Sequence, residues 1–173
     1  SGTNRIVGPN TPTFFNITGP NVGNVGGVSF SGFGYVFGGA GDDNFVFSNG
    51  ATLSGGINGG AGVNTMDLRT YSAPTILNLA ASRVTALGGR FSSIQSFIAG
   101  DNILNRVQGS NTDSVFNITG ANTGNVAGVS FSGFGSLTGG TANDTFVFSV
   151  GASLSGSINA GTGTNWIDFA AYT

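Results

Sequence analysis

The segment GVSFSGFG at residues 27–34 returns letter for letter at residues 128–135. A second segment, FNITG at residues 15–19, returns at residues 116–120, again 101 positions later. Aligning residues 15–72 with residues 116–173 at this offset, without gaps, gives 36 identical positions out of 58. Self-similarity at a fixed period is the sequence signature of repeat architectures. We therefore divide the chain into a first copy, residues 1–101, and a partial second copy, residues 102–173.

The composition differs from that of an ordinary globular enzyme. The 173 residues include 32 Gly and 15 Phe, and only 7% are charged, against about a quarter in typical domains. The charges are five Arg and seven Asp, with no His and no Cys. The many apolar side chains argue against disorder, and the few scattered Arg argue against nucleic acid binding. No apolar run approaches the ~20 residues of a spanning helix, so we expect no membrane insertion.

A shorter rhythm runs inside the long period. Glycine-rich punctuation recurs at steps of roughly 20 residues, for example near residues 19, 39 and 60. Between these points lie short runs such as NFVF at residues 44–47 and TMDL at residues 65–68. Alternating β-branched or aromatic residues bounded by Gly, Asn and Asp are typical of β-strands.

Short strands at this spacing, with no helical crossovers, predict an all-β fold. We expect one continuous parallel β-solenoid, like a β-helix or β-roll, in which stacked coils bury a shared core. A coil of about 20 residues and a rise of ~4.8 Å would give eight to nine coils, a rod roughly 40 Å long and about 24 Å per 101-residue unit. Phe and Ile would form inner stacks, and turn residues would form hydrogen-bonded ladders. The alternative fold is a β-sandwich, which also uses short strands.

One nonapeptide carries a family resemblance. Residues 38–46 read GGAGDDNFV, which fits the pattern G-G-x-G-x-D-x-U-x of calcium-binding β-rolls. Together with the following stretch to residue 71, this segment resembles the RTX-like or filamentous-haemagglutinin-like repeats of giant bacterial surface proteins, which act as adhesins. The resemblance implies a secreted, extracellular protein at the cell surface, with a role in adhesion or in a biofilm matrix.

The same resemblance implies a calcium site. In such rolls, glycine carbonyls and Asp carboxylates of adjacent turns supply hard oxygen ligands. The matching residues here are Asp42, Asp43, Asn64 and Asp144, although Ala142 replaces a motif Gly and Asn64 replaces a motif Asp. We expect no required cofactor, with Ca²⁺ as the one candidate. The other reading is structural: Gly and Asx residues suit tight turns, and their side chains cap the backbone.

Catalysis is not expected. A polysaccharide-degrading β-helix enzyme would need acid and base groups in one cleft, and the chain has no His, Lys, Cys or Glu. Asp67 could approach another carboxylate, but it recurs as Asp168 at the same repeat position. Recurrence at repeat positions suits a structural role better than a unique active site.

The sequence therefore predicts a structural repeat module that forms a rod or fibre for adhesion, cell linkage or an extracellular matrix. The expected partners are other copies of the chain, stacked end to end into a filament. The competing interpretation is an adhesin segment that recognises glycans or a surface receptor.

Overall fold

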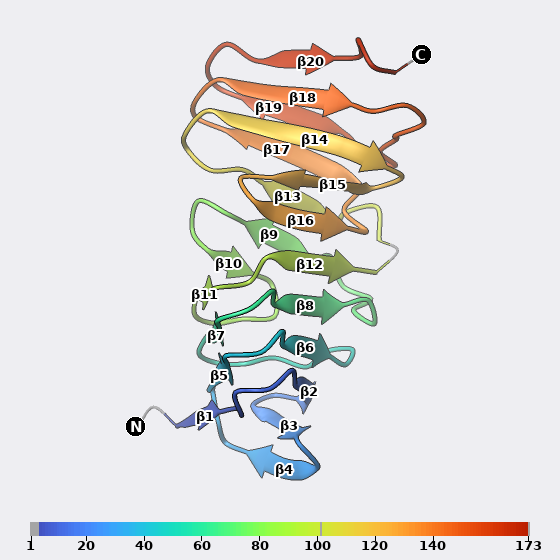
Figure 1. The fold of residues 1–173 in the computed structure, drawn as a ribbon. Coiled ribbons are helices and arrows are strands. Elements are labelled where there is room, and N and C mark those ends of the chain that lie inside the picture. The colour runs from blue at the N-terminus through green and yellow to red at the C-terminus, as the bar shows by residue number, and fades with distance from the viewer. Residues whose placement is uncertain (1–3, 101, 173) are drawn as a thin grey trace.

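The computed structural model describes residues 4–100 and 102–172 (Figure 1). Within these residues the chain forms twenty β-strands and no helix, which confirms the all-β prediction. The strands are short, from two to seven residues. In chain order they are β1 (Arg5–Val7), β2 (Phe14–Gly19), β3 (Val22–Val25), β4 (Val28–Ser31), β5 (Tyr35–Gly39), β6 (Asn44–Phe47), β7 (Ile57–Gly60), β8 (Thr65–Leu68), β9 (Ile76–Asn78), β10 (Arg83–Val84), β11 (Phe91–Ser92), β12 (Ser96–Ala99), β13 (Arg106–Gln108), β14 (Ser114–Gly120), β15 (Thr123–Val126), β16 (Val129–Ser132), β17 (Ser136–Gly140), β18 (Asp144–Phe148), β19 (Ile158–Gly161) and β20 (Trp166–Asp168).

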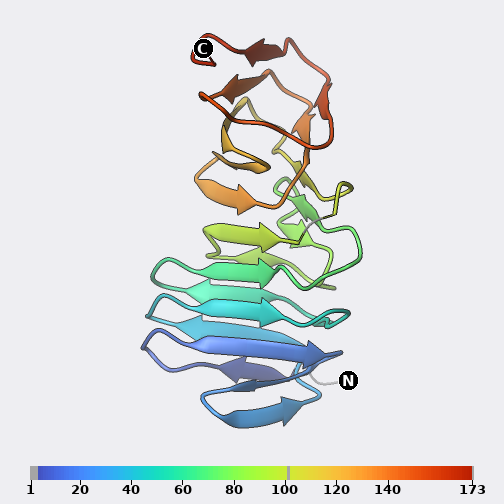
Figure 2. The same cartoon turned by 90° about the vertical axis from the view of Figure 1, so that its right-hand side faces the viewer.

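The strands belong to three sheets that run along one long axis. The largest has eleven strands in the order β20-β18-β14-β15-β16-β12-β8-β6-β2-β3-β4. A four-stranded sheet, β1-β5-β7-β11, and a five-stranded sheet, β10-β9-β13-β17-β19, complete the set. The molecule is elongated, with its N-terminal strands at one end and β20 at the other (Figures 1 and 2).

Neighbouring strands of the large sheet are mostly parallel and distant in sequence. Phe45 lies opposite both Phe15 and Met66, and the same row continues to Phe97 and Phe131. The step along the chain from Phe45 to Met66 is close to the predicted coil length. The other steps in this row are about one and a half times as long. The predicted uniform coil length therefore holds only for the shortest step in this row. The count of eight to nine coils, which was calculated from that length, is wrong.

Antiparallel meanders explain part of the difference. Strands β2, β3 and β4 pair antiparallel in succession, and β14, β15 and β16 repeat the arrangement in the second copy. The turns between them hold Asn21 at φ 55° and Gly27 at φ 81°, a backbone region that Asn and Gly adopt readily. Such residues mark a hairpin as readily as the end of a coil. The punctuation at Gly19 is therefore a hairpin, and the large sheet is mixed.

The core contains the predicted aromatic stacks. Phe15 and Phe45 stack with ring centroids 4.8 Å apart, and their counterparts Phe116 and Phe146 stack at 4.7 Å. All four rings are fully buried. Such pairs contribute about 0.5–1.5 kcal/mol beyond the burial of their area. This aromatic stack therefore has the same residues and the same packing in both copies.

Strands of the two copies lie in one sheet. β12 of the first copy pairs in parallel with β16 of the second, with Phe97 opposite Phe131. The predicted boundary between the copies includes residue 101, which lies outside the described residues, as do residues 1–3 and 173. Hydrogen-bonded pairing therefore continues from one copy into the next.

Candidate functional site

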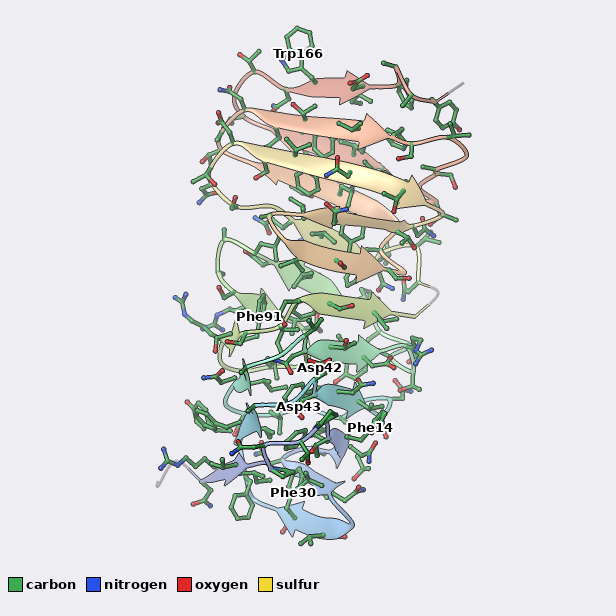
Figure 3. The ribbon with its side chains drawn as sticks, in the orientation of Figure 1. Phe14, Phe30, Asp42, Asp43, Phe91 and Trp166 are labelled. Atoms are coloured by element: carbon green, nitrogen blue, oxygen red, sulfur yellow. The ribbon has the colours of Figure 1, made fainter. Side chains whose placement is uncertain are left out.

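The predicted site begins in the turn between β5 and β6, where Asp42 and Asp43 lie next to each other (Figure 3). The side chain of Asp43 is buried. One carboxylate oxygen accepts a hydrogen bond from the backbone N–H of Thr13 at 3.0 Å, and the other accepts one from Gly39 at 2.9 Å. Asp43 thus links its own turn to Thr13, the residue just before β2.

The same interaction continues from one turn to the next as a ladder. The backbone N–H of Asp43 donates to Asn64 Oδ1 at 2.8 Å, and the N–H of Asn64 donates to Gln95 Oε1 at 2.8 Å. In the second copy, the N–H of Asp144 donates to Asn165 Oδ1 at 2.8 Å. A buried backbone N–H without a partner would cost free energy comparable to a lost hydrogen bond. These side chains satisfy the turns, as the predicted ladders require.

A second, outer ladder uses the neighbouring residues. Asp42 Oδ1 accepts from the N–H of Val63 at 2.7 Å. Its counterpart Asn143 accepts from the N–H of Thr164 at 2.7 Å. Asn serves here as well as Asp, so the position requires a side-chain oxygen and no charge.

The burial of Asp43 changes its ionisation. Burial disfavours the charged carboxylate and raises the pKa of Asp43, with a smaller contribution from the adjacent Asp42. The hydrogen bonds from Gly39 and Thr13 favour the charged form and oppose this rise. Burial thus destabilises the charged carboxylate of Asp43, while that carboxylate accepts the hydrogen bonds of two backbone N–H groups.

Three of the four predicted calcium ligands meet in adjacent turns: Asp42, Asp43 and Asn64. Asp144 lies in the equivalent turn of the second copy. The amide of Asn64 donates to the carbonyl oxygens of Ala61 at 3.1 Å and Ser93 at 3.0 Å, so two oxygens that a cation could use are engaged. In the part of the chain that the structure describes, no group of three or more Asp is placed to hold a metal.

The turn-capping interpretation thus accounts for the side chains of Asp42, Asp43 and Asn64, whose oxygens accept backbone hydrogen bonds. Asp144 differs slightly from Asp43: one oxygen accepts from Gly140 at 2.7 Å, while the other is buried without a hydrogen-bond partner. Calcium binding stays a prediction.

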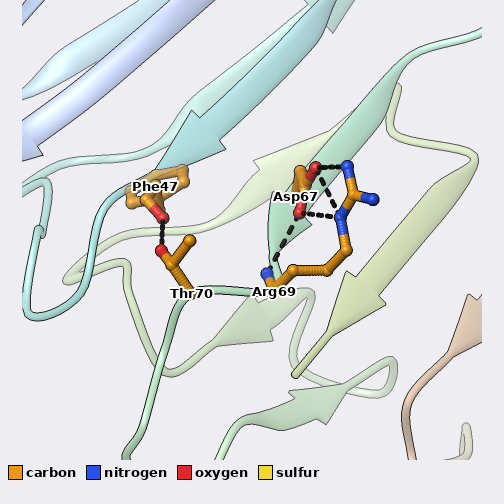
Figure 4. Close-up of polar contacts among 4 residues, drawn as sticks. All are labelled: Phe47, Asp67, Arg69 and Thr70. Carbon is orange, nitrogen blue, oxygen red and sulfur yellow. Dashed lines mark hydrogen bonds and ion pairs between the residues drawn. The ribbon is translucent and has the colours of Figure 1, made fainter. Parts of the chain in front are cut away.

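The recurring carboxylate considered for catalysis also holds a turn. Asp67 is buried and forms an ion pair with Arg69, whose Nη2 lies 2.6 Å from Asp67 Oδ2 (Figure 4). This hydrogen bond raises the pKa of the Arg69 guanidinium. In the second copy, Asp168 accepts from the backbone N–H of Ala170 at 2.7 Å, and no Arg stands at that position. Both carboxylates therefore have the local role that repeat positions suggest.

The sequence analysis did not predict a groove on the outer face of the four-stranded sheet, β1-β5-β7-β11. It has a volume of about 410 Å³, and its walls include Tyr35, Phe37, Asn58, Arg90 and Ser92. The signal was present in the alignment of the copies, where Tyr35 and Phe37 of β5 correspond to Ser and Thr of β17. Outward aromatic residues that one copy lacks are not needed to build the fold.

No family model, curated protein or solved structure matches this chain. Within residues 4–100 and 102–172, no helix is long and apolar enough to cross a membrane. The function is therefore inferred from the geometry of the strands, the turns and the groove.

Proposed function

We propose that this chain is a structural module of a secreted, cell-surface protein, and that it extends by stacking into a rod or fibre. The observation that carries the proposal is the pairing of β12 with β16, which joins the two copies within one eleven-stranded sheet. Each copy also repeats the same registers, since Phe15 faces Phe45 and Phe116 faces Phe146. A unit that joins its successor through sheet hydrogen bonds can be added many times along one axis.

The proposed architecture is a solenoid with coils of unequal length. Parallel pairs between strands distant in sequence support it, because a sandwich of hairpins would pair neighbouring strands antiparallel. From β2 to its counterpart β14, the large sheet advances by six strand positions. At ~4.8 Å each, one 101-residue unit would extend the rod by roughly 29 Å. This exceeds the ~24 Å expected from uniform coils because the meander adds strands to the sheet.

The two ends of the large sheet support end-to-end contact. In the first copy, β8 is covered by β12, and Met66 is fully buried. In the second copy, the equivalent Ile167 on β20 is 52% exposed, beside an exposed Trp166 (Figure 3). At the other end, β4 is the last strand of the sheet, whereas its counterpart β16 pairs with β12.

Both ends would therefore accept a strand that runs parallel to β12. We propose that β20 of one chain pairs with β4 of the next chain in this orientation, as a head-to-tail contact. Head-to-tail contacts that do not close into a ring produce filaments. The exposed apolar side chains on β20 would be buried by the contact, which supplies the driving force.

Adhesion, cell linkage and matrix formation are the roles that such a rod would serve outside the cell. With 7% charged residues, the surface relies on uncharged polar groups, and side-chain hydrogen bonds link successive turns. The adhesin alternative, in which the module binds a glycan, is favoured by one observation, the groove on β5, β7 and β11.

The proposal is tested by small-angle X-ray scattering of the chain and of a tandem fusion of two chains. We expect the fusion to have the same cross-section and about twice the length. Scattering from two compact particles joined by a flexible linker would contradict the proposal. Electron microscopy at high concentration should show filaments of the single chain, and discrete particles would count against the head-to-tail contact.

A further inference from the structure

The groove is built from two rows of outward side chains on the four-stranded sheet. Register places Arg5 beside Tyr35 and Phe37 beside Asn58. The row of Asn58 then continues to Ser92 on β11. Alternate residues of these strands point inward to the core, as the burial of Val36 and Ile57 shows. The outward rows therefore present aromatic and polar groups on a rigid sheet.

A glycine makes this surface hollow. Gly56 lies between Tyr35 and Arg90 across the strands. The backbone N–H of Val36 donates to the carbonyl oxygen of Gly56, and the N–H of Ile57 donates to the carbonyl oxygen of Arg90. A Cβ added to Gly56 would lie 2.1 Å from the carbonyl oxygen of Arg90. Position 56 therefore has no room for a side chain, and the surface between the Tyr35 ring and Arg90 is hollow.

The second copy shows that these aromatic residues are not structural. Tyr35 and Phe37 correspond to Ser136 and Thr138, which stand at the same outward positions of β17. The inward residue between them stays apolar and buried in both copies. The strand therefore forms equally well with small polar residues on its outer face, and the exposed Tyr35 and the half-buried Phe37 of the first copy are not among the buried core residues.

The charge of the groove is positive. Arg90 is exposed, and among the described residues the one ion pair is that of Arg69 with Asp67. Arg5 stands 6.0 Å above the ring of Phe37, so a second guanidinium borders the same surface. None of the residues that line the groove is acidic, although the whole chain carries a net charge of −2.

We propose that this groove binds an acidic polysaccharide, with a uronic acid residue placed over Tyr35 and Phe37. Aromatic rings offer a flat apolar face with a polar edge, which suits the C–H face of a pyranose ring. Arg forms paired hydrogen bonds to a carboxylate, and Asn58 and Ser92 can bond to hydroxyl groups. With a volume of about 410 Å³, the groove is of the size that holds a small ligand.

This inference goes beyond the structural role and does not rest on it. A rod without sugar binding, and sugar binding without a rod, are distinguished because the first is measured by scattering and the second by titration. The groove also lies within the first copy alone, so its binding does not require a second copy.

The test is isothermal titration calorimetry of the chain with trigalacturonate and with the neutral trisaccharide of galactose. We expect the acidic sugar to bind and the neutral sugar to bind at least about tenfold more weakly, a difference of about one charge-assisted hydrogen bond. The Y35S/F37T variant gives the first copy the residues of the second, and it should raise the Kd for trigalacturonate by about tenfold or more. R90Q should do the same. Binding by the wild type should weaken as salt is added.

The matched control is R106Q, because Arg106 stands beside Ser136 as Arg5 stands beside Tyr35. It should leave the Kd unchanged, and circular dichroism should show every variant folded. Absence of binding by the wild type would overturn the proposal. Equal affinity for both sugars would also overturn it, and so would an unchanged Kd in Y35S/F37T or in R90Q. A loss in R106Q as large as that in R90Q would show general charge attraction and would equally contradict it.

Discussion

The first copy, residues 1–101, and the partial second copy, residues 102–173, share the buried stack of Phe15 on Phe45, repeated as Phe116 on Phe146, and differ on the outward faces of β5 and β17. Phe45 and Phe146 occupy the same place in the same stack, with the same burial. The outward Tyr35 has become Ser136, and the groove is found in the first copy. The comparison teaches that the inward rows and the turn ladders determine the fold, while the outer rows are free to acquire a separate role.

The copies also differ in what covers them. β8 pairs with β6 on one side and β12 on the other, whereas its counterpart β20 pairs with β18 and is the last strand of the sheet. Identical residues are therefore expected to contribute more stability in the first copy than in the second. Paired substitutions in the two copies test this difference.

The largest effect is expected from the aromatic stack. Phe45→Ala would leave a cavity between two covered strands and should lower the free energy of unfolding by about 3–5 kcal/mol. Phe146→Ala should cost less, because β20 beside it is exposed and can relax into the space. Urea unfolding of both variants checks this order. A greater loss of unfolding free energy in F146A than in F45A would show that the pairing of the neighbouring strand does not determine the size of the loss.

The next effect is expected from the inner ladder. Asn64 accepts from the N–H of Asp43 and donates to two carbonyl groups, so Asn64→Ala leaves buried polar groups without partners. We expect a loss of about 2–3 kcal/mol. Asn165→Ala, at the exposed end, should cost about 1 kcal/mol. Equal losses in the two variants, measured by thermal and urea unfolding, would contradict the role of coverage.

Asp43 gives a pH dependence. Its pKa is raised in the folded state above its ordinary value of 3.8, so the folded state holds the proton more tightly than the unfolded state. The corresponding stability is fully present below that ordinary value and is lost as the pH rises through the folded-state pKa. Asn does not titrate, so the advantage of the wild type over D43N should shrink as the pH rises. Melting curves of both proteins across this range check the sign, and a widening advantage would contradict it.

Removal of calcium should have little effect. The turn oxygens of Asp42, Asp43 and Asn64 already accept backbone hydrogen bonds, so we expect the same Tm in a chelator and in millimolar Ca²⁺. A Tm that rises with calcium concentration would reveal a site by mass action. The D144N variant would then show whether the buried free oxygen of Asp144 is a ligand.

The smallest effect is expected from Arg69→Ala. The side chain is exposed, and the second copy folds with Ala170 at the equivalent position. Asp67 is buried, but in the variant it keeps the hydrogen bond from the backbone N–H of residue 69. Because the guanidinium itself lies in solvent, we expect only a small fall in Tm. A large drop would show that Asp67 depends on its Arg in a way that Asp168 does not.

The sequence predicted strands such as β6 and β8, the inner stacks and hydrogen-bonded ladders at the turns, because each depends on local pattern or on repeat equivalence. It did not predict the lengths of the coils. Gly19 and Gly39 carry the same turn signal, and each ends a strand. The strand that ends at Gly19 pairs antiparallel with the next strand in a hairpin, whereas the strand that ends at Gly39 pairs in parallel with β7. Only long-range pairing separates these two outcomes, since Gly and Asn suit both kinds of turn.

The groove could not be predicted for the same reason. It depends on Arg90 lying one strand beyond Gly56, and on Gly56 lying one strand beyond Tyr35. These offsets follow from the spacing along the chain between paired strands, which the sequence wrongly predicted to be uniform. The aromatic residues themselves were visible, and comparison of the copies at outward positions would have singled them out.

The most direct measurement is cryo-electron microscopy of a tandem fusion of several chains, at a resolution that separates strands. The fold predicts one continuous sheet with a spacing of ~4.8 Å along the axis and an advance of roughly 29 Å for each 101-residue unit within a chain. Separate globules, or face-packed antiparallel sheets without this axial spacing, would contradict it.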